Sequence, residues 1–275
     1  MYDPAALLTD SLPTVSTPLL DRLRDSAQPA WRDPRVLRPE FIERACAWFA
    51  GSQLNRLVGL DQFAVREATM GCNHFIDNLI MRHGVESLQI FEHDYGYYRR
   101  LQPHLRYAQL DRLFPGMPVL IALPFPGHMA THINMREILD QASRSVCPVH
   151  IDCAWLGAAR GIDFDFGHPA IASIGMSFSK GMDLWWNRVG VRFSKIKVDS
   201  DSITAYNEHE MIPVMLMSTG LHYLDSVAPD HVWNYHAKRY DEICRDLKLR
   251  PTAIVHVAQS LDRRRMYGLK ALLEG

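Results

Sequence analysis

Short apolar runs typical of buried strands recur along the middle of the chain. Such runs occur in residues 117–128, 147–157, 171–180 and 188–194. An amphipathic helical pattern over residues 134–145 separates the first two runs. Strands at these intervals, some of them separated by helices, are typical of a parallel sheet covered by crossover helices. The sequence therefore predicts an α/β fold, with a mostly parallel central sheet and helices on both faces.

Further elements are predicted on either side of this region. Helical patterns cover residues 38–51, 69–84 and 228–249, a short strand begins the segment 87–98, and residues 251–259 form a strand-like run.

Changes in pattern along the chain predict three parts. Residues 1–35 are rich in Pro, Asp and Ser and are interpreted as an irregular N-terminal arm. Residues 36–200 form the large α/β domain. The pattern weakens after residue 200, so residues 201–275 are expected to form a small, reduced C-terminal α+β domain.

Composition excludes several classes of protein. The 275 residues are 47% hydrophobic and carry a net charge of −1, which gives no electrostatic case for binding nucleic acid or an anionic membrane. No apolar run approaches the ~20 residues that span a bilayer. The N-terminus lacks the pattern of a signal peptide, and the five cysteines are odd in number without paired spacing. A cytoplasmic protein with reduced thiols and no metal site is expected.

Polar residues fall where predicted strands end, and ligands of parallel α/β sheets bind at the carboxyl ends of strands. Asp152 and Lys180 each close an apolar run. The segment 71–73 opens a predicted helix, whose free backbone N–H groups form an anion site. Arg188 adds a permanent cation suited to a phosphate. A lysine, a carboxylate and an anion site around one crevice suit pyridoxal phosphate, which a lysine binds as a Schiff base.

Four blocks in chain order strengthen this interpretation. They are Gly71-Cys72-Asn73, His93-Asp94-Tyr95-Gly96-Tyr97-Tyr98, Asp152-Cys153-Ala154-Trp155, and Ser177-Phe178-Ser179-Lys180 followed by Arg188-Val189-Gly190. Together they resemble the motifs of fold-type I pyridoxal-phosphate enzymes, especially class I/II aminotransferases such as histidinol-phosphate aminotransferase. The blocks span about residues 60–195.

The resemblance implies a role for each matching residue. Lys180 would form the Schiff base and move protons, Asp152 would pair with the pyridine nitrogen, and Tyr95 would stack on the ring. The remaining cofactor-binding residues would be those of the phosphate site together with Trp155. The phosphate-site residues are Gly71, Cys72, Asn73, Ser177, Ser179 and Arg188. The family usually forms homodimers with active sites at the subunit boundary.

The sequence also departs from the family pattern. Trp155 stands where the family has a tyrosine, and Phe125 falls at about the position of an asparagine. An indole N–H can donate a hydrogen bond, whereas a phenyl ring cannot. The run 251–259 lacks the arginine that binds a substrate carboxylate, although Arg263, Arg264 and Arg265 follow it. The C-terminal region is also shorter than is usual in the family.

The leading hypothesis is an aminotransferase-like enzyme that acts on an amino acid or amine. A decarboxylase, lyase or racemase on the same scaffold is an alternative, because the cofactor chemistry is shared. A homologue that binds the cofactor without turnover is a third hypothesis. The departures favour this third hypothesis, and the retained Lys180 and Asp152 oppose it.

Overall fold

A seven-stranded sheet forms the centre of the computed structural model, which describes residues 14–27, 31–84, 86–101, 106–109 and 112–275. In spatial order its strands are β2 (Val65–Thr69), β9 (Gly190–Ser194), β8 (Ile171–Ser177), β6 (Val149–Cys153), β5 (Val119–Ala122), β3 (Gln89–Ile90) and β4 (Arg106–Tyr107). Strand β9 is antiparallel to both of its neighbours, and the other pairs are parallel. The predicted mostly parallel α/β fold is therefore confirmed.

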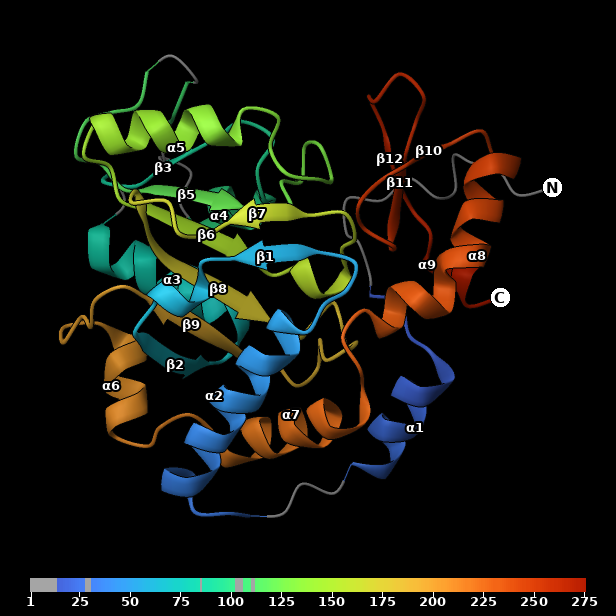
Figure 1. Ribbon diagram of the computed structural model, residues 1–275, viewed down its shortest axis with the longest axis horizontal. Coiled ribbons are helices and arrows are strands. Elements are labelled where there is room, and N and C mark those ends of the chain that lie inside the picture. Colours follow the sequence, from blue (N-terminus) through green and yellow to red (C-terminus); the bar gives the residue numbers. More distant parts are fainter. Residues whose placement is uncertain (1–13, 28–30, 85, 102–105, 110–111) are drawn as a thin grey trace.

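Helices cover both faces of this sheet (Figure 1). The side chains of β5 pack alternately into the apolar clusters on the two faces. Leu120 packs in one apolar cluster with residues of α3 (Gly71–His83). Val119 and Ile121 belong to the other cluster, which contains the buried face of α5 (Met135–Arg144). Because neighbouring side chains of a strand point to opposite faces, one apolar strand supplies both cores.

The N-terminal region is more regular than predicted. Helix α1 (Pro18–Ser26) lies within the segment interpreted as an irregular arm, and α2 (Pro34–Ala50) begins before residue 38. Each helix has a proline in its first turn and a preceding cap, since Thr17 and Asp33 accept hydrogen bonds from backbone N–H groups. The prediction was wrong because Thr-Pro and Asp-Pro act here as helix starts.

The C-terminal region combines helices with a small antiparallel sheet. Its elements are α6 (Ser202–Glu208), α7 (Val214–Ser226), α8 (His231–Asp246), β10 (Arg250–Pro251), β11 (Val257–Gln259), β12 (Met266–Gly268) and α9 (Lys270–Leu273). The strand predicted over 251–259 is interrupted, because the Thr252 hydroxyl bonds the Ile254 and Val257 carbonyls in a turn. Helix α6 packs on β2 and α7 packs on α2, so the domain boundary at residue 200 stays a prediction.

Smaller elements complete the fold. They are β1 (Arg56–Val58), which pairs with β7 (Asp163–Asp165), the 3-10 turns η2 (Leu60–Gln62) and η3 (Leu156–Ala158), and α4 (Gly96–Leu101). Across the described ranges, none of the helices is long and apolar enough to cross a bilayer.

A buried ionic network ties β9, β2 and α6 together. The Arg192 guanidinium is buried, and its Nε donates to Glu67 Oε2 at 2.9 Å. The same guanidinium bonds Asp201 and, at 2.9 Å, the Thr204 hydroxyl. Burial alone would raise the pKa of Asp201, but the hydrogen bonds from Arg192 and Thr204 outweigh it and lower this pKa. The stability that Asp201 contributes is therefore present above its ordinary pKa of 3.8 and is lost as the pH falls through its lower folded value.

Replacing Arg192 with methionine should destabilise the protein by about 3–5 kcal/mol, because two buried carboxylates lose their cation. Urea unfolding monitored by circular dichroism measures this change. Arg56→Met is the matched control, since Arg56 pairs with Asp163 at the surface and its loss should change stability little. Equal unfolding midpoints for the two variants would contradict the structural role of the network.

Candidate active site

The candidate site lies at the carboxyl edge of the parallel strands. Asp152 lies near the end of β6, beside Gly175 of the neighbouring strand β8. Lys180 follows the end of β8 by three residues. Tyr95 comes from the segment between β3 and α4. The fold therefore brings residues from separate blocks of the sequence to one edge of the sheet.

Asp152 is held in a fixed position. Its side chain is only 3% exposed, and its carboxylate accepts hydrogen bonds from the Tyr98 hydroxyl at 2.9 Å and the Ala154 N–H at 3.0 Å. Burial raises the pKa of Asp152, and the hydrogen bonds from Tyr98 and Ala154, together with the nearby Cys72 thiol, oppose this effect. The sequence argument did not assign Tyr98 a role. Tyr98 follows Tyr95 by three residues, about one helical turn, and this spacing indicates that the two side chains can lie at the same site.

The Cys72 side chain faces the sheet. Its thiol donates to the Gly175 carbonyl at 3.3 Å and lies beside the Asp152 carboxylate. Burial raises the pKa of this thiol well above its ordinary value. The backbone of Cys72, rather than its thiol, is therefore the part of the residue that remains to bind an anion at the start of α3.

An anion cradle forms where the start of α3 meets the loops after β8 and before β9. Gly71 has φ of +75°, and a Cβ atom there would lie 3.4 Å from Ser177 Oγ and 3.6 Å from Arg188 Cβ. Ser177 Oγ lies 3.0 Å from Ser179 Oγ. The Arg188 side chain is exposed, and it forms no ion pair with a carboxylate of the described residues. The start of α3 and two hydroxyls thus lie beside Arg188.

Lys180 lies against the face of Trp155. Its Nζ is 4.5 Å from the centroid of the indole ring. Burial, and then the charge of Arg188, lowers the pKa of Lys180 from 10.5 to about 8, although Asp183 opposes the shift. A larger fraction of this amine is therefore neutral, and so nucleophilic, near neutral pH than in an ordinary lysine.

The C-terminal region contributes a histidine that the sequence argument missed. The His256 and Trp155 rings meet edge to face, with centroids 5.3 Å apart. His256 is 1% exposed, and neither of its ring nitrogens has a hydrogen-bond partner among the described residues. Burial, and then the charge of Lys180, lowers its pKa well below the ordinary value. His256 lies in the run 251–259, where an arginine that binds a substrate carboxylate was expected. That position in the chain was the sequence feature that could have indicated a residue of the site.

Tyr95 lies beside the site with its ring half-buried. Its centroid is 5.6 Å from that of Tyr98, and burial and Asp152 raise its pKa. Asp94 anchors its backbone, because one carboxylate oxygen accepts from the Tyr95 N–H at 2.7 Å and the other from the Ala122 N–H at 3.3 Å. Burial raises the pKa of Asp94 to about 8.

Asn73, predicted to bind phosphate, and Phe125, at the position of the expected asparagine, both contact side chains outside the residues predicted for the site. The Asn73 side chain hydrogen-bonds Tyr97. The Phe125 ring is buried and packs against His132, with centroids 4.5 Å apart.

Over most of the chain, the fold resembles that of solved aminotransferases and related enzymes. No family model matches the sequence, and no curated protein matches it. An aspartate aminotransferase from Thermus thermophilus, solved as a double mutant, has a TM-score of 0.66 and 12% identity, covering 92% of this chain and 75% of that one. An aminotransferase from Mycobacterium tuberculosis has a TM-score of 0.64 and 14% identity, with coverages of 91% and 74%.

A different activity occurs on the same fold. The pyridoxal-phosphate-bound C-S lyase from Staphylococcus hominis has a TM-score of 0.61 and 12% identity, covering 92% of this chain and 74% of that one. At these low sequence identities, the similarity shows that the chain shares a fold with these proteins. It does not show a shared activity, which depends on the residues of the site.

Proposed function

We propose that this protein is a pyridoxal-phosphate-dependent aminotransferase that acts on an amino acid or amine, with Lys180 as the residue that binds the cofactor covalently. The observation that supports the proposal is that Asp152 lies near the end of β6 and Lys180 follows the end of the neighbouring strand β8, at the same edge of the sheet as the start of α3. Solved neighbours that bind this cofactor share the fold.

The chemistry of these groups fits the cofactor. A phosphate suits the cradle, because the start of α3 lies beside the Ser177 hydroxyl and Gly71 adopts a φ of +75°, which residues with a side chain seldom adopt. The buried carboxylate of Asp152 suits a protonated ring nitrogen, and the desolvated amine of Lys180 suits a carbonyl carbon.

Asp152, Lys180 and Trp155 have separate roles in the proposed reaction. When bound, pyridoxal phosphate draws electrons from the substrate carbon next to the linked nitrogen. Asp152, fixed by Tyr98 and Ala154, holds the proton of the pyridine nitrogen. Once the substrate amine had taken its place on the cofactor, Lys180 Nζ would be able to take the proton from the substrate carbon and return it to another atom. Trp155 covers Lys180 and limits the access of water.

A lyase is the second candidate function. A C-S lyase shares the fold, and Trp155 and the buried Phe125 replace residues expected from the aminotransferase pattern. The bond that breaks depends on how the substrate is oriented, so turnover of an amino-acid panel distinguishes the two activities. Release of a keto acid only with a second keto acid as acceptor supports transamination, whereas release without an acceptor supports a lyase.

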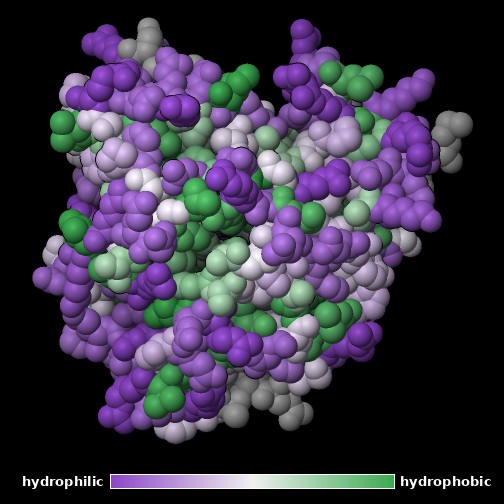
Figure 2. All heavy atoms as spheres, viewed as in Figure 1, coloured by the Kyte–Doolittle hydropathy of each residue, from purple (hydrophilic) through white to green (hydrophobic). Residues whose placement is uncertain are grey.

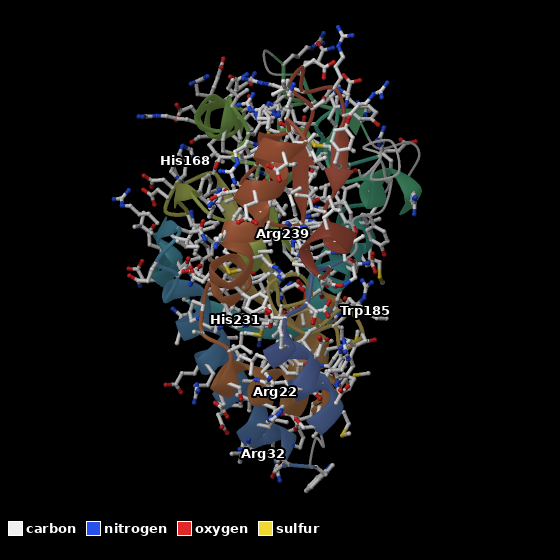
Figure 3. All side chains as sticks on the ribbon, turned by 90° about the vertical axis from the view of Figure 1, so that its right-hand side faces the viewer. Arg22, Arg32, His168, Trp185, His231 and Arg239 are labelled. Carbon is white, nitrogen blue, oxygen red and sulfur yellow. The ribbon has the colours of Figure 1, made fainter. Side chains whose placement is uncertain are left out.

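The predicted homodimer also belongs to this proposal. Trp185 and Trp186 are 57% and 39% exposed, only a few residues after Lys180. Trp185 lies on the side of the molecule that carries α1 and α8 (Figure 3). A second copy that covered these indoles would place the subunit boundary next to the site.

The absorbance spectrum of the purified protein mixed with pyridoxal phosphate tests the proposed function. A visible band that sodium borohydride removes supports a covalent link to the cofactor. The lack of such a band would overturn the proposal. A reducible band without turnover of any amino acid or amine would instead favour the homologue that binds the cofactor without catalysis.

Replacing Arg188 with alanine should weaken cofactor affinity by about ten- to a hundredfold. A charge-assisted hydrogen bond to phosphate contributes about 1.5–3 kcal/mol, which corresponds to this change. Titration of the visible band measures the affinity. Arg144→Ala, at the exposed end of α5, is the matched control. Unchanged affinity in the Arg188 variant would exclude Arg188 from the phosphate site.

A further inference from the structure

Asp183 lies three residues after Lys180, and partners from the N-terminal part of the chain bind its carboxylate. The side chain is buried, since the residue is only 5% exposed. The Thr14 hydroxyl donates a hydrogen bond to Asp183 Oδ1, and Arg24 Nη1 lies 3.7 Å from Oδ2. Asp183 therefore joins the loop after β8 to a residue 169 positions away in the sequence.

Residues 14–17, called here the N-terminal segment, are themselves fixed to the C-terminal region. They form neither helix nor strand, yet all four are buried. The Ser16 N–H donates to Glu274 Oε1 at 2.6 Å, and His236 Nε2 of α8 donates to the Ser16 carbonyl at 2.7 Å. The surface that α8 presents in Figure 2 is mostly hydrophilic, whereas His236 is buried against the segment. The N-terminal segment is thus a fixed support for Asp183.

The loop that contains Lys180 also packs on the turn that follows Trp155. A Cβ atom on Gly181 would lie 2.6 Å from the Gly157 carbonyl oxygen and 2.9 Å from its Cα, closer than a real side chain can approach. The two backbones are therefore in direct contact. Lys180 Nζ lies 4.5 Å from the centroid of the Trp155 ring. The loop is thus held at two points, by Gly181 against η3 and by Asp183 against the N-terminal segment.

The backbone at Asp183 indicates that the carboxylate itself matters. Its φ of +52° lies in the left-handed region, which glycine adopts without strain and aspartate adopts less readily. The negative charge also opposes the lowering of the Lys180 pKa by burial and Arg188. An aspartate therefore makes the loop less relaxed and the amine less easily neutral. Both effects disfavour an aspartate here, unless its contact with the N-terminal segment is needed.

The charged and titratable groups around the two residues come from several elements. Those that act on Asp183 or are acted on by it are Arg24 of α1, Tyr223 of α7 and Lys270 of α9, and those that have this relation to Lys180 are Asp183, Arg188 and His256.

We propose that Asp183 is a positioning residue, which fixes Lys180 in its reactive place by binding the loop after β8 to the N-terminal segment. The inference rests on the proposed function, because it takes Lys180 to be the amine that binds the cofactor. Loss of the carboxylate should then have two opposite effects. The amine becomes neutral more readily, but it is held less firmly. A residue that only stabilised the fold would not separate these effects.

The pH dependence of the rate at which the borohydride-reducible band forms tests the effect of the charge. Asp183→Asn keeps the shape of the side chain and suits the left-handed backbone. The rise of the rate with pH should move to lower pH, with band formation about two- to tenfold faster at pH 7. Asp21→Asn is the matched control, because Asp21 accepts from Ser16 Oγ at 2.9 Å and Arg24 Nη2 at 2.8 Å. It should leave the rise unchanged.

Circular dichroism of the same visible band tests the position, because a bound chromophore gives a strong signal when the protein holds it in one orientation. Asp183→Gly removes the carboxylate and adopts a φ of +52° without strain. It should keep the reducible band and lose most of the dichroism. Thr14→Val removes the hydroxyl from the other side of the contact and leaves the Lys180 loop unaltered, so it should lose part of the signal.

An unchanged pH profile in Asp183→Asn, or an equal shift in Asp21→Asn, would overturn the inference. Full dichroism in Asp183→Gly would also overturn it. If far-ultraviolet circular dichroism shows that the glycine variant does not fold, full visible dichroism in Thr14→Val overturns the inference and a partial loss supports it. Failure of the proposed function is recognised separately, because the wild type would then show no borohydride-reducible band.

Discussion

Replacing Lys180 with alanine should abolish the borohydride-reducible absorption band of the protein mixed with pyridoxal phosphate, and turnover with it. The variant lacks the amine that lies against the face of Trp155. Lys195→Ala is the matched control, because it removes another lysine with a lowered pKa that lies away from the candidate site. Burial also lowers the pKa of Lys195, but its Nζ donates to the His168 carbonyl at 2.9 Å, beyond the opposite end of β8. A band that survives in Lys180→Ala, or disappears in Lys195→Ala, would contradict the assignment.

The pH dependence of band formation tests the environment of Lys180. The neutral amine is the reactive form, so the rate should rise with pH through about 8, the lowered pKa of Lys180. An ordinary lysine would give this rise near 10.5. Arg188→Ala removes a positive charge that helps to lower this pKa, so it should move the rise to higher pH. Stopped-flow absorbance measures the rate, and a rise confined to the ordinary range would show that Lys180 is not desolvated.

Replacing Asp152 with asparagine should lower kcat by about a hundredfold or more, because an amide cannot keep the ring nitrogen protonated. Asparagine has nearly the same shape and can still accept the hydrogen bond from Tyr98, so the fold and much of the cofactor binding should persist. Single-turnover kinetics with saturating cofactor measure the loss.

A graded control accompanies this variant. Tyr98→Phe keeps the Asp152 carboxylate and removes one of its hydrogen bonds, worth about 1 kcal/mol, so its effect on kcat should be only several-fold. Full activity in Asp152→Asn would remove Asp152 from the proposed chemistry. A loss in Tyr98→Phe as large as that in Asp152→Asn would mean that the hydroxyl acts directly.

The sequence predicted the central sheet well because its strands are continuous apolar runs that local patterns reveal. Strand β2 was missed because Val65–Thr69 mixes Arg66 and Glu67 with apolar residues, and the buried Glu67 has distant partners, Arg192 and Thr204, that local patterns do not reveal. The carboxyl ends of β6 and β8 are side by side, so the strand-end argument foresaw that residues near them would meet.

Contacts between distant segments were less accessible to prediction. The hydrogen bond of Tyr98 to Asp152 and the packing of His256 on Trp155 join segments far apart in the chain. Local periodicity contains no information about such pairs. The interrupted strand after Pro251 has a similar cause, since the Thr252 hydroxyl replaces part of the backbone pairing.

The pairing of β2 with β9 has a consequence for the order of events during folding. Thr69 pairs with Gly190, so Gly71 and Arg188 come together only when segments separated by most of the sheet have joined. Such non-local pairing forms slowly, because a long loop must close first. The anion cradle therefore forms only after these segments pair, and a phosphate-bearing ligand that binds there as proposed would bind the folded protein and not partly folded chains. At a hundred times its dissociation constant, such a ligand would add about 2.7 kcal/mol to the free energy of unfolding.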